Sequence, residues 1–100
     1  MKDGYEIYRR LVDICDQWSA YQKDVRVKAA HLSKDGGYAV IGDLNQPKNK
    51  RYSVHYVDSH ACVHGMGYDL NEKQAIAKFE RKTGIRVCSL TLGEQTVRVK

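Results

Sequence analysis

The chain is 100 residues long, 42% of them are hydrophobic, and it contains a single proline. A chain of this length forms one domain, placed here at residues 1–100, and its apolar content argues against disorder. No apolar run approaches the roughly 20 residues that span a membrane, and the start, Met1 to Gly4, lacks the apolar segment of a signal peptide. We therefore expect a cytoplasmic protein with no membrane partner.

The three cysteines, Cys15, Cys62 and Cys88, are odd in number and widely spaced, with no C-x-x-C pair. This spacing indicates reduced thiols and argues against a disulfide framework. A phosphate-binding loop is also missing, because Gly65-Met66-Gly67 lacks the rest of any such pattern. We expect neither a cofactor nor enzymatic activity.

The formal net charge of +5 is unevenly distributed along the chain. Residues 1–24 carry four basic and five acidic side chains, whereas residues 25–100 carry thirteen basic and seven acidic ones. The basic excess therefore belongs to the later part of the chain. Such an excess favours an anionic partner, with plain solubility as the alternative explanation.

The first element is predicted to be a helix that begins at Asp3, where Glu6 completes a D-x-x-E capping pattern. Apolar residues then recur at spacings of four, three, four and three, which marks one helical stripe. The stripe consists of Ile7, Leu11, Ile14, Trp18 and Tyr21. We expect the helix to continue to about Gln22 and to bury this stripe, Trp18 included.

Two strands are predicted next, over residues 25–32 and 38–44, with a glycine-containing turn over residues 33–37 between them. In the first strand, apolar residues alternate with basic ones. A polar loop with the single proline follows over residues 45–50.

A β-hairpin is predicted over residues 50–68, with a two-residue turn at Asp58-Ser59. Because side chains alternate between the two faces of a strand, this register creates one apolar and one polar face. The apolar face carries Tyr52, Val54, Tyr56, Ala61 and Val63. The polar face carries Ser53, His55, Val57, His60, Cys62 and His64. A shift of one residue in the pairing would exchange the faces.

A second helix is predicted from Glu72 to Thr83. Asn71 and Gln74 have the spacing of a capping box, and Gly84 suits a left-handed C-cap. The buried positions of this helix are Ala75, Ile76 and Phe79.

Two more strands are predicted over residues 85–92 and 95–100, joined by a turn at Gly93-Glu94. The element order α-β-β-β-β-α-β-β predicts an α+β fold. We expect a small two-layer sandwich, in which an antiparallel sheet of about four to six strands carries both helices on one face. The other face would be open, or buried against a partner.

The helix–strands–helix outline is similar to that of double-stranded-RNA-binding domains. That family has a lysine-rich start to its last helix and a Gly-Pro-x-His loop. Here the helix opens Asn71-Glu72-Lys73-Gln74, and the loop is absent. The resemblance is one of outline, so the chain is assigned to no family.

Three histidines and one cysteine share the polar face of the predicted hairpin: His55, His60, Cys62 and His64. Nitrogen and sulfur ligands of this kind bind Zn²⁺, and a Cys–His pair can generate a nucleophilic thiolate. However, their spacing matches no structural zinc signature, and side chains on a flat face point in parallel. A half-exposed polar face is the simpler interpretation.

The candidate binding residues are the basic side chains of the second half together with the hairpin histidines. They are Lys48, Lys50, Arg51, His55, His60, His64, Lys78, Arg81 and Lys82. Cations that reach phosphates, combined with exposed rings such as Tyr38 and Tyr68, are typical of nucleic-acid-binding proteins. An open sheet face or edge strand would instead recruit a protein or a second copy of the chain.

From these patterns we predict a small non-enzymatic binding protein that docks on a macromolecular partner, either a protein or a nucleoprotein assembly. Inhibitors and accessory proteins of phages or mobile elements are of this size class. The protein would be a monomer, or a homodimer formed through the open sheet face. Direct binding of DNA or RNA through the basic second half is the alternative. A metal- or thiol-dependent activity at His55, His60, Cys62 and His64 is the third hypothesis.

Overall fold

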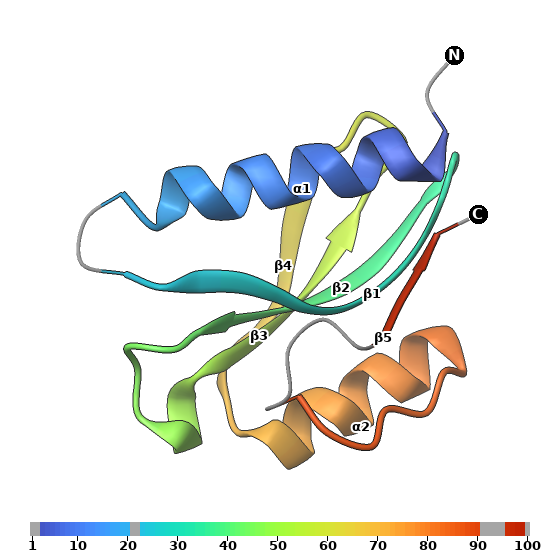
Figure 1. Ribbon diagram of the computed structural model, residues 1–100. Coiled ribbons are helices and arrows are strands. Elements are labelled where there is room, and N and C mark those ends of the chain that lie inside the picture. Colours follow the sequence, from blue (N-terminus) through green and yellow to red (C-terminus); the bar gives the residue numbers. More distant parts are fainter. Residues whose placement is uncertain (1–2, 21–22, 91–95, 100) are drawn as a thin grey trace.

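A five-stranded mixed sheet lies between two helices (Figure 1). The computed structural model describes residues 3–20, 23–90 and 96–99. In chain order the elements are α1 (Gly4–Trp18), β1 (Val25–Ser33), β2 (Gly36–Asp43), the 3₁₀ turn η1 (Lys48–Lys50), β3 (Tyr52–Val57), β4 (Val63–Leu70), α2 (Glu72–Thr83) and β5 (Thr96–Val99). The strand order is β4-β3-β2-β1-β5. The predicted α+β sandwich is confirmed, and within the described ranges no helix has the length and apolar composition to cross a membrane.

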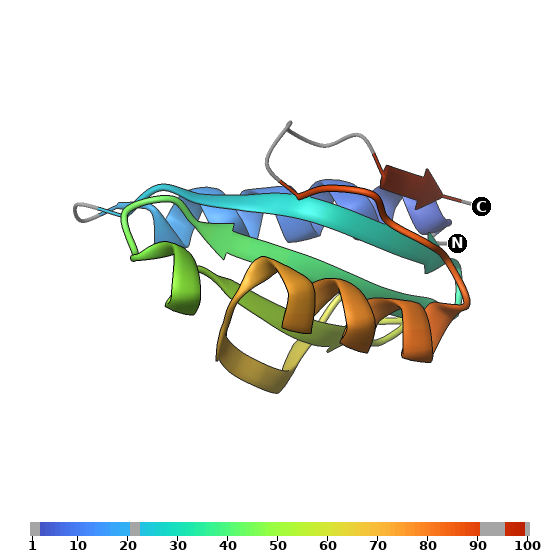
Figure 2. The ribbon, with the colours of Figure 1, turned by 90° about the horizontal axis from the view of Figure 1, so that it is seen from below.

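The two helices cover opposite faces of the sheet, so the prediction that both lie on one face is wrong. Neighbouring residues of a strand point to opposite faces. Ala30 and Ile41 pack in the cluster beneath α1, whereas Ala29 and Val40 pack in the cluster beneath α2. Figure 2 shows α1 and α2 on either side of the strands. Because neither face is open along its whole length, a homodimer through an open sheet face loses its basis.

The start of α1 follows the sequence prediction. Asp3 is the N-cap, and its carboxylate accepts a hydrogen bond from the Glu6 amide at 2.9 Å. Ile7 and Leu11 are fully buried against the sheet, as expected from the stripe. Tyr21, the last residue of the predicted stripe, lies outside the described residues.

The end of α1 differs from the prediction, because the helix stops at Trp18 and not near Gln22. Ser19 is the C-cap, and its hydroxyl donates to the Cys15 carbonyl at 2.9 Å and accepts from the Val25 amide at 2.9 Å. This side chain therefore ties the end of the helix to the start of β1. Trp18 is 43% exposed, which corrects its assignment to the core.

Local signals in the sequence define α2, and its predicted bounds are confirmed. The Gln74 amide donates to the Asn71 side chain at 2.8 Å and the Asn71 amide donates to the Gln74 side chain at 3.0 Å, which completes the capping box. Gly84 ends the helix with a φ of 74°, in the left-handed region that glycine adopts without strain. Ala75 and Phe79 are fully buried.

The segment after α2 packs on the sheet without forming a strand. The predicted strand over residues 85–92 is wrong for residues 85–90, and the remainder lies outside the described residues together with the Gly93-Glu94 turn. Val87 and Leu90 are nevertheless buried in the α2-side cluster. The last strand, β5, is confirmed, but it pairs in parallel with β1, so the prediction of a wholly antiparallel sheet is wrong.

The β3–β4 hairpin turns through residues 58–62 and not through two residues. Val57 pairs with Val63, and Tyr56 pairs with His64. The partner of each residue at this end of β3 therefore lies three positions further along β4 than the two-residue turn predicts. Since three is odd, the residues of β4 exchange faces relative to the prediction.

Asp58 explains why the hairpin loop is longer than expected. One carboxylate oxygen accepts hydrogen bonds from the His60 and Cys62 amides, both at 2.9 Å, and the other lies 3.0 Å from Nε2 of His64. These bonds, above all the one to His64, lower the pKa of Asp58 to about 2. The loop is thus organised around one ionised aspartate.

Candidate functional site

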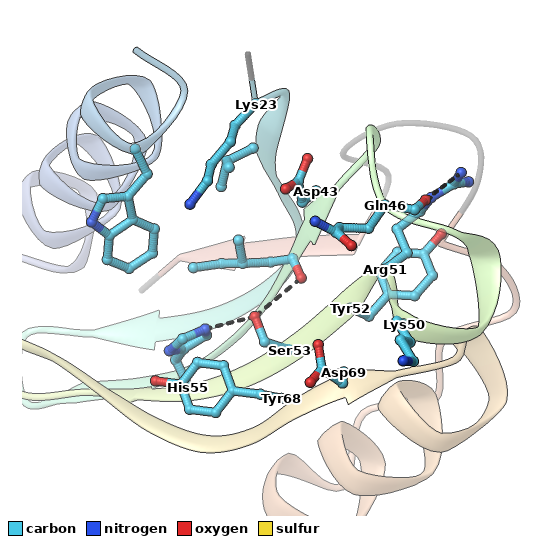
Figure 3. Close-up of a pocket in the computed structure, with 13 residues that line it drawn as sticks. Lys23, Asp43, Gln46, Lys50, Arg51, Tyr52, Ser53, His55, Tyr68 and Asp69 are labelled. Atoms are coloured by element: carbon cyan, nitrogen blue, oxygen red, sulfur yellow. Dashed lines mark hydrogen bonds between the residues drawn. The ribbon is translucent and has the colours of Figure 1, made fainter. Parts of the chain in front are cut away.

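A pocket of about 420 Å³ opens between the last turn of α1 and the nearby ends of β2, β3 and β4 (Figure 3). Its walls differ in chemistry. Figure 3 shows His55 and Tyr68 on one side of the pocket and Lys50 and Arg51 on the other, with Lys23 at the rim. The pocket therefore places aromatic surface opposite positive charge.

His55 is the centre of the aromatic wall. Its ring lies 6.1 Å from that of Trp18 and 5.5 Å from that of Tyr68, measured between centroids. The three rings come from β3, α1 and β4. His55 is only 3% exposed, whereas Trp18 and Tyr68 are 43% and 63% exposed. The buried imidazole thus supports two rings that present surface to solvent.

Gly65 and two irregularities in β4 create the position of Tyr68. The β3–β4 pairing shifts register on both sides of Val54, and bulges of this kind re-aim side chains. A Cβ atom at Gly65 would overlap the Tyr68 ring, so the ring lies across a residue without a side chain. Asp69 follows with a φ of 56°, a left-handed conformation within the irregular part of the strand.

Ser53 and His55 project from the same face of β3 and bond to each other. The Ser53 hydroxyl lies 2.8 Å from Nε2 of His55 and donates to the Ile41 carbonyl at 3.4 Å. Nδ1 of His55 is buried and has no hydrogen-bond partner in the described part of the chain. Burial lowers the pKa of His55 below its ordinary value, so the ring is neutral at pH 7. The serine–histidine distance suits proton transfer, but no described acid orients Nδ1.

The cationic side of the pocket has one fixed and two exposed groups. The Arg51 guanidinium donates to the Gln46 carbonyl at 3.1 Å and 3.2 Å, which holds the loop before β3 in place. Lys23 and Lys50 are exposed at the pocket rim. Asp43 also lines the pocket, and its carboxylate accepts hydrogen bonds from nearby backbone amides. The net charge around the opening is therefore weakly positive.

Only part of the predicted basic set lies at this pocket. Lys50, Arg51 and His55 line it, and Lys48 lies on the exposed 3₁₀ turn beside it. The remaining basic candidates, Lys78, Arg81 and Lys82, belong to α2 on the other face of the sheet. The contribution of Trp18 to the pocket was not predicted from the sequence. A signal for the Tyr68 wall was present in Gly65-x-Gly67, since glycines inside a strand often mark the close approach of another group.

The structure does not bring the four predicted metal candidates together. His55 lies on the α1 side of the sheet, and His64 lies on the α2 side as the cross-strand partner of Tyr56. His60 and Cys62 belong to the hairpin loop. Among the described residues, no three His, Cys, Asp or Glu side chains are placed to hold one metal ion. The longer loop is the physical reason, because its odd shift sends alternate residues to the other face.

Comparison of the chain with protein-family models, with curated proteins and with solved structures found no match.

Proposed function

We propose that the protein binds single-stranded nucleic acid and that one unpaired nucleotide enters the pocket. The observation that carries this proposal is the arrangement of the exposed Trp18 and Tyr68 rings opposite Lys50 and Arg51. A base can stack on an aromatic ring whatever its sequence, at a gain of about 1–3 kcal/mol per base. A pocket of about 420 Å³ falls in the range of small-ligand sites, about 300–1,000 Å³.

The charge of the protein also favours nucleic acid as the ligand, but at the pocket it contributes less to binding than stacking does. The rim combines Lys23, Lys50 and Arg51 with Asp43 and Asp69. The whole chain carries a net charge of +5, which attracts a polyanion over longer distances. We therefore expect stacking to determine how tightly the nucleotide is held, and the overall charge to increase the association rate.

Docking on a protein, the first expectation from the sequence, is the second candidate function. β4 is an edge strand and could add a partner strand. However, its pairing with β3 shifts register twice, and bulged edges are a common device against strand addition. The exposed rings of the pocket are therefore the better argued contact surface.

Trp18 provides the test, because it is the only tryptophan and lies in the pocket wall. Its fluorescence should be quenched when oligouridylate or oligothymidylate is added, and binding should weaken as salt rises. A parallel titration with uridine monophosphate distinguishes binding of a nucleotide within a strand from binding of a free nucleotide. Equal affinity for the monophosphate and the oligomers would assign the pocket to free nucleotides.

Matched variants identify the residues responsible. Tyr68→Ala should weaken oligonucleotide binding roughly 5- to 100-fold, since it removes one stacking platform. Tyr5→Ala removes an equally exposed tyrosine, 59% against 63%, from α1 outside the pocket and should leave binding unchanged. Likewise, Lys50→Ala should reduce the salt dependence, whereas Lys73→Ala on α2 should not. Absence of any quenching by either oligomer at low salt would refute the proposal.

A further inference from the structure

The pairing register aligns one residue from each of the five strands in a single row across the sheet. His31 pairs with Tyr38, Tyr38 with Tyr56, and Tyr56 with His64, while Arg98 of β5 pairs with His31. We name this set the cross-sheet row: Arg98, His31, Tyr38, Tyr56 and His64. Directly paired residues project from the same face. The row is therefore one continuous strip, although its members are scattered over the sequence.

The row lies on the α2 side of the sheet, opposite to the pocket. Tyr38 packs against the cluster that contains Phe79 of α2. The ring centroids of Tyr38 and Tyr56 are 5.6 Å apart, and those of Tyr56 and His64 are 5.8 Å apart. Three rings from β2, β3 and β4 thus form an unbroken aromatic surface.

The row is accessible because α2 ends beside it. Tyr56 is 37% exposed, the His64 side chain is 56% exposed, and Arg98 is exposed. A hollow of about 330 Å³ separates the row from the last turn of α2, and its lining includes His31, Tyr38 and Lys82. The helix therefore leaves this end of the sheet open to a ligand.

Charges around the row favour an anionic ligand. Arg98 stands at one end, and Lys82 of α2 borders the hollow. At the other end of the row, Nε2 of His64 lies 3.0 Å from the Asp58 carboxylate. This single negative charge opposes the two cations. Rings in the middle with cations at the side suit a strand whose bases stack and whose phosphates lie along one edge.

We infer that the cross-sheet row is a second binding surface for single-stranded nucleic acid, with bases on Tyr38 and Tyr56 and phosphates near Arg98 and Lys82. The inference rests on the proposed function only for the class of ligand. The pocket and the row lie on opposite faces of the sheet, so a strand that reaches both must pass around an edge. A long strand then gains affinity from both surfaces at once, because binding at one raises the effective concentration at the other.

The experiment compares Tyr56→Thr, which keeps a strand-forming residue, with the control Tyr5→Ala on α1. The probes are oligouridylates of about 4 and about 16 nucleotides, the range of site sizes for stacking platforms. Binding is followed by the anisotropy of a labelled oligomer and, separately, by the fluorescence of Trp18. Tyr56→Thr should weaken binding of the long oligomer roughly 5- to 100-fold, while Trp18 quenching at saturation remains. Arg98→Ala is the second variant, and thermal melts verify that both variants fold.

The outcomes separate the row from the pocket. If both variants bind both oligomers with unchanged affinity, the cross-sheet row is not a binding surface, and the proposal for the pocket is unaffected. Binding that depends on Tyr56 without quenching of Trp18 would support the row and refute the pocket. Competition by oligoglutamate as effective as that by oligouridylate of equal length would show recognition of charge alone, or of an acidic peptide. That result would overturn the inference.

Discussion

The two helices each carry one large aromatic ring in their C-terminal half, and the two rings are buried to very different extents. Phe79 of α2 is fully buried, whereas Trp18 of α1 is 43% exposed. Both occupy positions that helical periodicity directs toward the sheet. Trp18 is the last residue of α1 and borders a pocket, whereas Phe79 has a further turn of helix after it. Periodicity thus indicates which side of a helix faces the sheet, but not where along the helix apolar partners end.

Phe79→Ala should produce the largest effect of any single change considered for the two helices. Removing a fully buried phenylalanine ring leaves a cavity and should lower the free energy of unfolding by about 3–5 kcal/mol. The measurement is the urea midpoint with an unchanged slope. Phe79→Leu, which keeps most of the volume, should lose much less. A loss below about 1 kcal/mol for the alanine variant would contradict the assignment of this ring to the core.

Trp18→Ala should destabilise the protein less than Phe79→Ala, but it should weaken oligonucleotide binding more than a core substitution does. Because nearly half of the indole is exposed, we expect a loss of about 2 kcal/mol, roughly half that of a fully buried ring. The same variant should weaken oligonucleotide binding by an amount similar to that expected for Tyr68→Ala, whereas Phe79→Leu should bind normally once folded. If Trp18→Ala proves as destabilising as Phe79→Ala, the contrast between the helices disappears.

Alanine substitutions at the two N-cap residues test whether capping stabilises the N-terminal ends of α1 and α2 to the same extent. Asn71→Ala removes half of a reciprocal capping box and should lower the free energy of unfolding by about 1 kcal/mol. Asp3→Ala removes a single bond to the Glu6 amide and should cost a similar or smaller amount. Thermal melts of both variants give the comparison. A larger loss at Asp3 than at Asn71 would contradict the expectation that the Asn71 side chain contributes at least as much to its helix as the Asp3 side chain does.

The smallest expected effect concerns the titration of His55 beneath Trp18. Burial lowers the pKa of His55, so its folded-state pKa lies below the value of about 6.5 expected when unfolded. Below about pH 6.5 the unfolded chain therefore binds a proton that the folded chain excludes, and stability falls as the pH drops toward the lowered pKa. In Trp18→Ala the ring should become more exposed, and its pKa should rise.

Imidazole resonances followed by NMR between pH 4 and pH 8, spanning the ordinary histidine pKa, would measure this shift, and the same titration of Trp18→Ala gives the comparison. An ordinary pKa for His55 in the wild type would contradict the burial of this side chain.

Much of the candidate site could not be predicted from the sequence, for a reason visible in the hairpin. Lys50, Arg51 and His55 were identified as binding residues, but Trp18 was assigned to the core. The pocket depends on how far α1 runs over the sheet and on the bulges that aim Tyr68. Both are relations between segments that lie far apart along the chain or pair irregularly.

The local sequence by itself determined the elements whose bonds close within a few residues. The capping box at Asn71 and Gln74 and the left-handed Gly84 define α2, and Asp3 defines the start of α1. The polar bonds involved span three or four residues, so neighbouring side chains are sufficient to specify them. The α+β class followed from the same local patterns.

Only the tertiary structure decided which face of the sheet each side chain and each helix occupies. The loop organised by Asp58 shifts the register by an odd number of residues and separates His55 from His64. Likewise, the consecutive buried residues Ala39-Val40-Ile41 require a cover on both sides, which places the helices on opposite faces. The physical reason is that register and layering are set by contacts between distant segments. In a strand with a period of two, one such contact determines the direction of every side chain.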